Sequence, residues 1–365
     1  MSYNIFSDET VKEIKGFGRP VAGWFCTYTP LEILDAAGYT PVRIGGEHTA
    51  TGKADSIMHT NICPYIKSCL EAAEDGKLDF ISAAVFTNGC DAQRRLFDVL
   101  RSRKPNMPSY LISVPKKNDP SGIARFTEEV SDFRKWAEKI AGRTISDETL
   151  ADSTALYIYL RSKLRGLDGA RRKNLPTLDG SRALEIMLAV QRMPAREAIK
   201  FILEEEEKIR HHPALRGPKV LLSGNMLDDP DLIRVIEKYG ARVFADDLCT
   251  GRRFWYMPEP KQDISPVEAL AAAYLLKPPC PRMAGGDDSV SEMKKLVENL
   301  RPEGVIFSIL KFCDTHLYNI PYMRMMLQNA GVKSLFIESD YTAGAGQAET
   351  RIQAFVEMLK EERGG

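Results

Sequence analysis

The chain contains 365 residues, of which 44% are hydrophobic and 27% are charged. This composition is ordinary for a globular protein and excludes long disordered segments or collagen-like repeats. Lys and Arg together number 50, as do Asp and Glu, so the formal net charge is zero. A chain without a global basic field is a poor candidate for binding nucleic acid or an anionic membrane.

The sequence predicts no membrane span and no secretory signal. Its longest purely apolar run, residues 269–276, is far shorter than the roughly 20 residues that cross a bilayer. Residues 1–10 are polar and acidic, whereas a secretory signal has a basic start and an apolar core. We therefore expect a cytoplasmic protein with no membrane or nucleic-acid partner, in which cysteines seldom form structural disulfides.

The first part of the chain alternates short apolar runs with amphipathic segments. Apolar and β-branched runs predict strands over residues 21–25, 81–87 and 110–114. Amphipathic segments predict helices over residues 31–37, 64–73 and 92–103. This alternation of strands and helices is typical of a parallel sheet.

Charged helical periodicity replaces this pattern over residues 122–210, and the alternation then returns. The later predicted strands cover residues 220–223, 242–245, 304–310 and 334–338. The later predicted helices cover residues 230–239, 292–300, 321–330 and 347–360. We place a boundary near His211, His212 and Pro213. The predicted fold is α/β, with two Rossmann-like parallel-sheet domains that are related by pseudo-duplication and joined by a helical segment. The predicted limits are 1–120, 121–216 and 217–365.

Six of the seven cysteines fall three to each α/β part, in matching sequence contexts. The pairs that share a following residue are Cys26 with Cys249 before Thr, Cys63 with Cys280 before Pro, and Cys90 with Cys313 before Asp. The first and last cysteines of each set are also equally far apart. This agreement indicates a duplicated unit. Cys69 has no counterpart and lies within a predicted helix, so we expect it to pack in the core.

The placement of the six cysteines favours metal binding over plain burial. Cys26, Cys90, Cys249 and Cys313 follow predicted strands, at the sheet edge where ligands collect. Cys63 precedes a proline-started helix, whose N-terminus favours the thiolate that binds metal. Sets of three suit a closed zinc site poorly, because such sites take four closely spaced ligands. An iron–sulfur cluster accepts ligands from distant loops, and three cysteines leave one iron of a cubane open.

Other motifs carry weaker predictions. Residues 46–53 resemble a phosphate-binding loop, but five residues separate the glycines and Ala54 replaces the Ser or Thr that binds magnesium, so no ATP site is expected. His316 could join a zinc site, although such a histidine more often packs or caps. The loop at residues 341–346 could cradle an anion or form a surface turn. The arginines beside the cysteines could bind phosphate or an electron-donor partner, or form solvated helix faces: Arg94, Arg95, Arg252 and Arg253. Asp91 and Asp314 could donate protons or cap the helices that follow them.

Segments around these cysteines resemble a known family across nearly the whole chain. They read GWFCTYTPLEI, NICPYIKS, NGCD, DDLCTGRR, PPCPRM and KFCD. The sequence is similar to the D-component, the catalytic iron–sulfur subunit, of 2-hydroxyacyl-CoA dehydratases, which are related to benzoyl-CoA reductase subunits. The resemblance implies an oxygen-sensitive [4Fe–4S] protein that receives low-potential electrons from a separate ATP-hydrolysing activator.

The resemblance leaves two versions of the site open. In the dehydratases three cysteines hold the cluster, and by motif they correspond to Cys63, Cys90 and Cys313. The implied substrate is then an (R)-2-hydroxyacyl-CoA, dehydrated through a ketyl radical. The full set of six looks more like the double-cubane-cluster proteins of the same family, which hold an [8Fe–9S] core and reduce small molecules. How the cysteines divide between two cubanes stays open.

We rank these functions in the order that the cysteine pattern favours. A double-cubane reductase comes first, and a dehydratase or benzoyl-CoA-type reductase subunit with one [4Fe–4S] cluster comes second. A non-catalytic metal-binding protein, holding zinc or a relay cluster, is the rival from another class. The resemblance also implies a dimer with a second copy or a homologous subunit.

Overall fold

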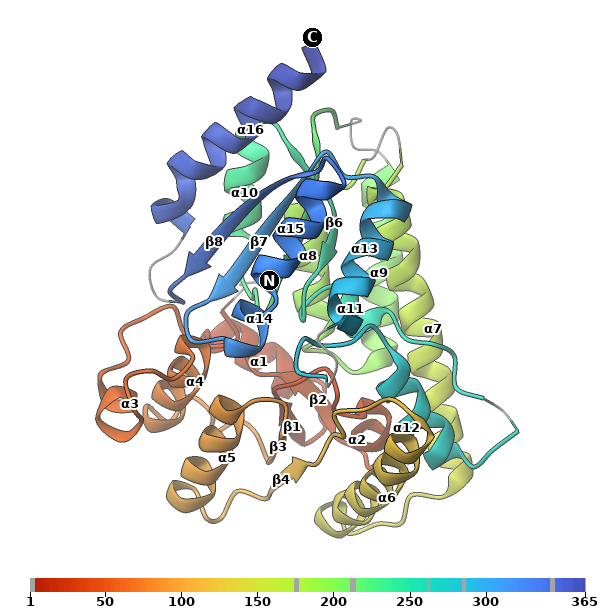
Figure 1. The fold of residues 1–365 in the computed structure, drawn as a ribbon. Helices are drawn as coiled ribbons and strands as arrows, with labels where there is room; N and C mark the ends of the chain where they lie inside the picture. The colour runs from red at the N-terminus through yellow and green to blue at the C-terminus, as the bar shows by residue number, and fades with distance from the viewer. Residues whose placement is uncertain are drawn as a thin grey trace.

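Two parallel sheets of four strands each organise the chain in the computed structural model (Figure 1). The structure describes residues 4–173, 177–210, 215–261, 263–283, 287–341 and 345–364, so the boundary predicted at His211 to Pro213 lies outside the described residues. Among the residues described, no helix is long and apolar enough to cross a membrane.

The first sheet has the strand order β2-β1-β3-β4 and the second has the order β6-β5-β7-β8. The first set of strands is β1 (Val21–Trp24), β2 (Thr40–Arg43), β3 (Ala83–Thr87) and β4 (Ser109–Ile112). The second set is β5 (Lys219–Gly224), β6 (Arg242–Asp247), β7 (Gly304–Leu310) and β8 (Lys333–Ser339). In both sheets the second strand in sequence lies at one edge, and the first, third and fourth follow across the sheet. This repeated order confirms the α/β fold with two Rossmann-like parallel sheets.

Helices surround both sheets. The N-terminal part contains α1 (Asp8–Gly16), α2 (Leu31–Ala36), α3 (Gly52–Ile57), α4 (Pro64–Glu74) and α5 (Asp91–Arg103). Four longer or central helices follow: α6 (Pro120–Ala141), α7 (Asp147–Arg171), α8 (Gly180–Val190) and α9 (Ala195–Arg210). The C-terminal part contains α10 (Asp231–Lys238), α11 (Arg252–Trp255), α12 (Pro266–Leu276), α13 (Asp287–Leu300), α14 (Asp314–Leu317), α15 (Ile320–Asn329), the 3-10 turn η1 (Ala345–Ala348) and α16 (Glu349–Gly364).

The central strands are buried along their length. Every residue of β7 is buried, as are all residues of β1 and β3. Strands that are covered by helices on both faces read as continuous apolar runs, and this explains why these segments could be predicted from sequence. The edge strand β2 was missed, because it is only four residues long and contains Pro41, a residue rare in strand interiors.

The helical segment ties the two sheets together. In Figure 1 the long helix α7 runs beside both halves, and α6 lies next to α12, against which it packs. One hydrophobic cluster joins Trp24 of β1, Phe133 of α6, Leu164 of α7 and Tyr274 of α12. Because α12 comes from the C-terminal part yet packs on α6, the division of the chain at residues 120 and 216 stays a prediction.

A buried ion pair fixes α2, α7 and α12 to one another. The Arg161 guanidinium lies 2.6 Å from a Glu32 oxygen, and the Tyr274 hydroxyl donates to the other Glu32 oxygen at 2.8 Å. Replacing Arg161 with methionine leaves the Glu32 carboxylate buried without its cation. We expect the free energy of unfolding to fall by about 3–5 kcal/mol in urea titrations.

Two controls accompany this variant. Combining Arg161→Met with Glu32→Leu removes both charges and should recover most of the loss. Lys135→Ala, which breaks an exposed pair with Asp132, should change stability by less than about 1 kcal/mol. A loss below about 1 kcal/mol for Arg161→Met would contradict the structural role given to this pair.

Candidate metal centre

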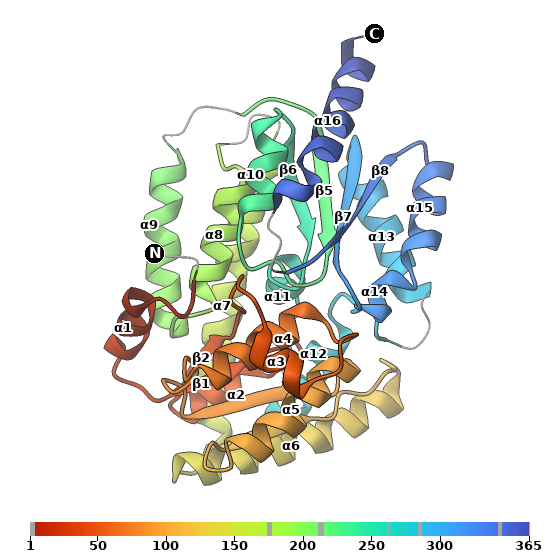
Figure 2. The same ribbon diagram turned by 90° about the vertical axis from the view of Figure 1, so that its left-hand side faces the viewer.

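The carboxyl ends of the two sheets face each other. Arg43, the last residue of β2, donates a hydrogen bond to the backbone oxygen of Cys249 at 2.7 Å, just beyond β6. The amide of Gly46, also beyond β2, donates to the Asp228 carboxylate at 3.1 Å, beyond β5. In both views of the fold, the short helices α11 and α14 lie at the level where the two halves meet (Figure 2). This junction is the kind of crevice in which α/β proteins bind ligands.

Three of the predicted cysteines stand at helix N-termini in this junction. Cys63 is the N-cap residue of α4, Cys90 that of α5 and Cys313 that of α14. None of the three side chains accepts a capping hydrogen bond from its helix. Each thiol stands where a strand or loop turns into a helix, next to the amides of the first helical turn.

The other three cysteines lie in loops that contact one another. Cys26 follows β1, Cys249 follows β6, and Cys280 follows α12. The amide of Cys280 donates to the Tyr28 hydroxyl at 3.3 Å, which connects the loops of Cys280 and Cys26. A Cβ atom at Gly89 would lie 3.9 Å from the Cys26 sulfur, so this thiol also reaches the loop before Cys90.

Electrostatic interactions join all six thiols. Burial, and then the neighbouring thiols of Cys313 and Cys90, raise the pKa of Cys63. Burial and Cys249, with a smaller effect of Cys26, raise the pKa of Cys280 to about 12. Cys90 interacts with Cys313 and with Cys26, and Cys313 interacts with Cys249. Like charges raise one another's pKa only at short range, so the structure brings the six predicted residues into one region.

The interactions between the thiols indicate two groups of three. Within one group Cys63, Cys90 and Cys313 each interact with the other two. In the other, Cys280 interacts with both Cys26 and Cys249. The electrostatic interactions of Cys90 with Cys26 and of Cys313 with Cys249 join the groups. Each group therefore mixes the two halves of the chain, which the matching dipeptides did not indicate.

The amides at the helix N-termini lower the pKa of the thiols, as expected, but burial raises it by more. The amides of Ile66 and Tyr65 in the first turn of α4 lower the pKa of Cys63, yet its pKa remains raised. Burial likewise raises the pKa of Cys90 to about 11, although the amides of Gln93 and Ala92 lower it. A cation would reverse this balance, because a coordinating thiol is deprotonated.

The spacing of the thiols suits a cluster better than a single zinc ion. Sulfur ligands around one tetrahedral zinc lie about 3.8 Å apart, given Zn–S bonds near 2.3 Å. Among the residues described, no group of three potential ligand atoms within 4.8 Å of one another contains a cysteine. All six cysteine residues are partly exposed. Such a donor set, soft and held apart, fits an iron–sulfur core.

A buried arginine lies beside these thiols. Arg253 forms a two-pronged pair with the Asp247 carboxylate, at 2.9 and 2.6 Å, and one nitrogen lies 3.9 Å from the Cys249 sulfur. Burial opposes the charge of the guanidinium, but Asp247 and the Cys249 and Cys280 thiols raise its pKa. The permanent positive charge stabilises nearby thiolates, and the pairing with Asp247 holds it in place.

His316 packs against a neighbouring charge, and the loop at residues 46–53 is not a phosphate site. His316 is buried against Arg253 at 3.4 Å, and burial with that charge lowers its pKa to about 3, so it packs as a neutral ring. The loop at residues 46–53 is no phosphate site, since Gly46 donates to Asp228 and Lys53 pairs with Asp75. In the loop predicted at residues 341–346, positions 342–344 lie outside the described residues.

Cys69 packs in the core, as predicted. It is fully buried, and its sulfur lies 3.4 Å from the Gly45 carbonyl.

The four arginines beside the cysteines fall into an exposed pair and a buried pair. Arg94 and Arg95 are exposed on α5, which confirms the solvated-face interpretation for them. Arg252 and Arg253 are buried, and Arg252 pairs with Glu292 at 2.8 Å, so that interpretation is wrong for this pair.

Asp91 and Asp314 occupy the first turns of α5 and α14 and are exposed. Asp91 lies 3.5 Å from Arg95. These contacts fit a helix-stabilising role, because a carboxylate in the first turn faces the positive end of the helix dipole.

One of the three cysteine pairings is not a structural equivalence. Cys90 and Cys313 both follow the third strand of their sheets, and Cys63 and Cys280 both lie between the second and third strands. Cys26, however, follows the first strand, whereas Cys249 follows the second strand of its sheet. A shared Cys-Thr dipeptide carries no information about which strand precedes it, and the prediction of three equivalent pairs is wrong at this point.

Sequence reasoning missed Asn225, Tyr28 and Lys277. The Asn225 side chain forms a hydrogen bond with the Cys313 thiol. The backbone carbonyl of Asn225 accepts from the Cys249 amide at 3.2 Å. The Lys277 ammonium lies over the Tyr28 ring and donates to the Thr27 carbonyl. Asn225 directly follows β5, so attention to every strand end would have found it.

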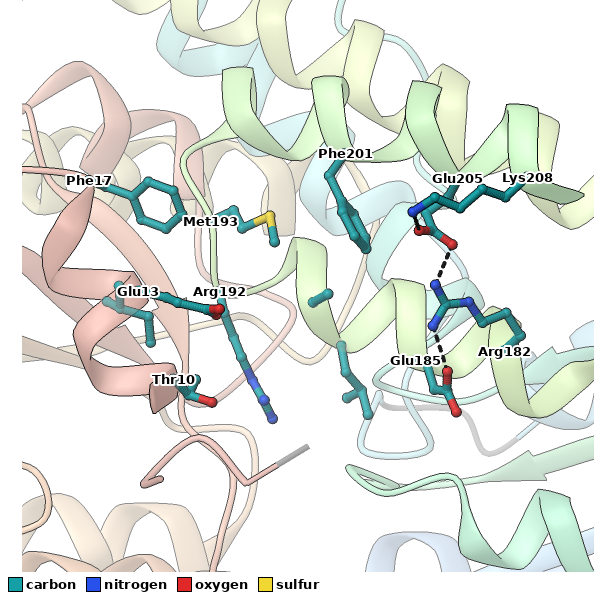
Figure 3. A pocket seen from close by; sticks show the side chains of 13 residues that line it. Thr10, Glu13, Phe17, Arg182, Glu185, Arg192, Met193, Phe201, Glu205 and Lys208 are labelled. Atoms are coloured by element: carbon teal, nitrogen blue, oxygen red, sulfur yellow. Dashed lines mark hydrogen bonds and ion pairs between the residues drawn. The ribbon is translucent and has the colours of Figure 1, made fainter. Parts of the chain in front are cut away.

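The cysteine region is distinct from a cavity of about 250 Å³ between α1, α8 and α9. Figure 3 shows that the charged side chains along one wall of this cavity pair with each other, since Arg182 lies between Glu185 and Glu205. None of the six cysteines lines it. Arg182 in this cavity is paired with its neighbours, and the cavity lies away from the cysteines. The candidate centre is therefore the junction between the two sheets.

Comparison with known proteins identifies the family. Residues 26–359 match the family of the 2-hydroxyglutaryl-CoA dehydratase D-component. The chain belongs to this family.

Relatives cover nearly the full length. The chain is 25% identical over 355 residues to the beta subunit of (R)-phenyllactyl-CoA dehydratase from Clostridium sporogenes, covering 96% of this chain and 94% of that protein. It is 26% identical over 342 residues to one of the subunits of benzoyl-CoA reductase from Thauera aromatica, covering 91% and 88%. It is 24% identical over 361 residues to the beta subunit of (R)-2-hydroxyglutaryl-CoA dehydratase from Acidaminococcus fermentans, covering 94% of each. Members of this family are thus subunits of both dehydratases and a reductase.

Proposed function

We propose that this chain is an iron–sulfur enzyme whose six clustered cysteines hold a double-cubane core. In this proposal it receives low-potential electrons from an ATP-hydrolysing activator and reduces small molecules. The observation that carries the proposal is the convergence of six partly exposed cysteines, from both halves of the chain, on one crevice. A dimeric assembly and a cytoplasmic location belong to the same proposal.

The two groups of thiols supply a division of ligands. Cys63, Cys90 and Cys313 would hold one cubane, and Cys26, Cys249 and Cys280 the other. Their links through Cys90 with Cys26 and Cys313 with Cys249 support neighbouring cubanes rather than two separate clusters. When bound, such a core stores low-potential electrons and passes them on.

The protein's own residues would prepare this crevice. Arg253 keeps a fixed positive charge beside the Cys249 and Cys280 thiols, and this charge favours the deprotonated form of Cys280. Asn225 holds the loop of Cys249 through its carbonyl and the Cys313 thiol through its side chain. Gly224, just before it, lets β5 approach β7 closely, since a Cβ there would lie 2.1 Å from the Ser308 carbonyl oxygen.

A second function rests on a specific observation. Cys63, Cys90 and Cys313 form a complete group of three, the number of ligands in a dehydratase cluster, and two of the relatives are dehydratase beta subunits. The alternative is therefore a dehydratase subunit with a single [4Fe–4S] cluster acting on an (R)-2-hydroxyacyl-CoA.

Product analysis with an activator, ATP and a panel of (R)-2-hydroxyacyl-CoA thioesters separates the two functions. Under the first proposal, the anaerobic protein consumes reductant with ATP but forms no enoyl-CoA detectable by mass spectrometry. Enoyl-CoA formation would instead establish the dehydratase. A protein that holds zinc without iron, and that neither consumes reductant nor forms product, would refute both.

A further inference from the structure

A second potential metal site lies in the junction, apart from the cysteines. His48 comes from the segment after β2, and Asp228 and Asp229 come from the segment after β5. The imidazole Nε2 lies 3.3 Å from Asp228 Oδ1 and 3.2 Å from Asp229 Oδ2. Among the residues described, this is the one group of three potential ligand atoms within 4.8 Å of one another.

The opposite atom of each side chain is already held. His48 Nδ1 donates to the Tyr341 carbonyl oxygen at 2.7 Å, which orients the ring so that Nε2 faces the two aspartates. Asp228 Oδ2 accepts from the Gly46 amide at 3.1 Å and from the Tyr341 hydroxyl. Asp229 Oδ1 accepts from the Asp231 amide at 2.9 Å. The three remaining atoms lie within 4.8 Å of one another, and outer-shell hydrogen bonds of this kind orient the ligands of metal ions.

Asp228 supplies an independent indication of a ligand. Its side chain is 4% exposed, and among the described residues its Oδ1 has no donor in good hydrogen-bond geometry, only the ion pair with His48 at 3.3 Å. A buried carboxylate oxygen without such a donor is costly, and a cation would satisfy it. The same residues line a cavity of about 60 Å³, which accommodates an ion with one or two waters.

The distances also agree with metal coordination. Ligands with bonds near 2.1 Å at tetrahedral angles lie about 3.4 Å apart, close to the two measured separations. We propose that His48, Asp228 and Asp229 bind one divalent transition-metal ion, of the Mn²⁺ or Zn²⁺ class, that links the carboxyl ends of the two sheets. One nitrogen and two carboxylate ligands favour such ions over the all-oxygen preference of Mg²⁺.

Mn²⁺ is the appropriate probe, because soft thiolates would capture zinc at the cysteines. Free Mn²⁺ is measured by EPR during titration of the full-length, cluster-loaded protein under anaerobic conditions. We expect saturable binding of one ion per chain, with imidazole-nitrogen coupling in pulsed EPR. His48→Ala should abolish that coupling, and His48→Ala and Asp229→Asn should each weaken binding by at least about tenfold.

Two control variants test whether Mn²⁺ binds at this site and not elsewhere on the protein. His59→Ala removes an exposed histidine outside the group and should bind Mn²⁺ like the unchanged protein. Cys249→Ser should also retain Mn²⁺, since no thiol is a ligand in this site. Unchanged circular dichroism of Asp229→Asn, a substitution of nearly equal size, establishes that it folds. Absence of saturable binding, or equal binding by Asp229→Asn and the unchanged protein, would show an ion pair only and overturn the proposal.

Discussion

Replacing Cys63 with serine is expected to abolish electron uptake and to remove at least half of the iron. Cys63 is the N-cap residue of α4 and interacts electrostatically with both other thiols of its group, Cys90 and Cys313. A serine hydroxyl does not ionise in this buried position, so the group would keep only two thiolate ligands. Both proposed functions use this group, and activity should fall to background under either one. Iron analysis and ATP-dependent reductant consumption measure the effect.

Cys69→Ala is the matched control for this experiment. Cys69 lies on the same helix, six residues further along, but is buried in the core and contacts the Gly45 carbonyl. Its removal should leave iron content and electron uptake unchanged, with a small loss of stability. If Cys63→Ser retained full iron and full electron uptake, Cys63 would not be a ligand.

Replacing Cys249 with serine should give the most selective result. Cys249 belongs to the second group, with Cys26 and Cys280, and has no counterpart among the three dehydratase ligands. If two cubanes are present, we expect the variant to lose about half of its iron and to keep about four irons per chain. Electron uptake should then fall sharply, because one cubane and the link between the two are lost.

A single-cluster protein would respond differently to the same change. Its iron content would stay the same in Cys249→Ser, because Cys63, Cys90 and Cys313 remain. The variant Cys280→Ser should behave like Cys249→Ser, since both residues belong to the same group of three thiols. Unchanged iron in both variants would refute the double-cubane proposal and leave the dehydratase alternative.

Much of the fold could be predicted because the strands are buried on both faces. Segments such as β3 and β7 are buried throughout and mostly apolar, and glycines or prolines mark the ends of many helices. The positions of Cys90 and Cys313 after strands followed directly from this pattern. β2 was missed because four residues with a central proline carry too little periodicity.

The grouping of the thiols in the candidate metal centre could not be predicted from the sequence. The division into two groups of thiols depends on how the two sheets face each other, and neither dipeptides nor spacing encode that. Arg253 follows the sequence pattern of a solvated helix, yet a buried Asp247 pairs with it. The contact of His48 with Asp228 joins residues that are far apart in the chain, so only the tertiary structure reveals it.

The number of iron and acid-labile sulfide atoms per chain tests the central claim most directly. The protein should be purified and analysed without exposure to oxygen. A double cubane held by six cysteines predicts about eight irons and about nine sulfides per chain. About four of each would contradict the double cubane, and zinc without sulfide would contradict an iron–sulfur centre altogether.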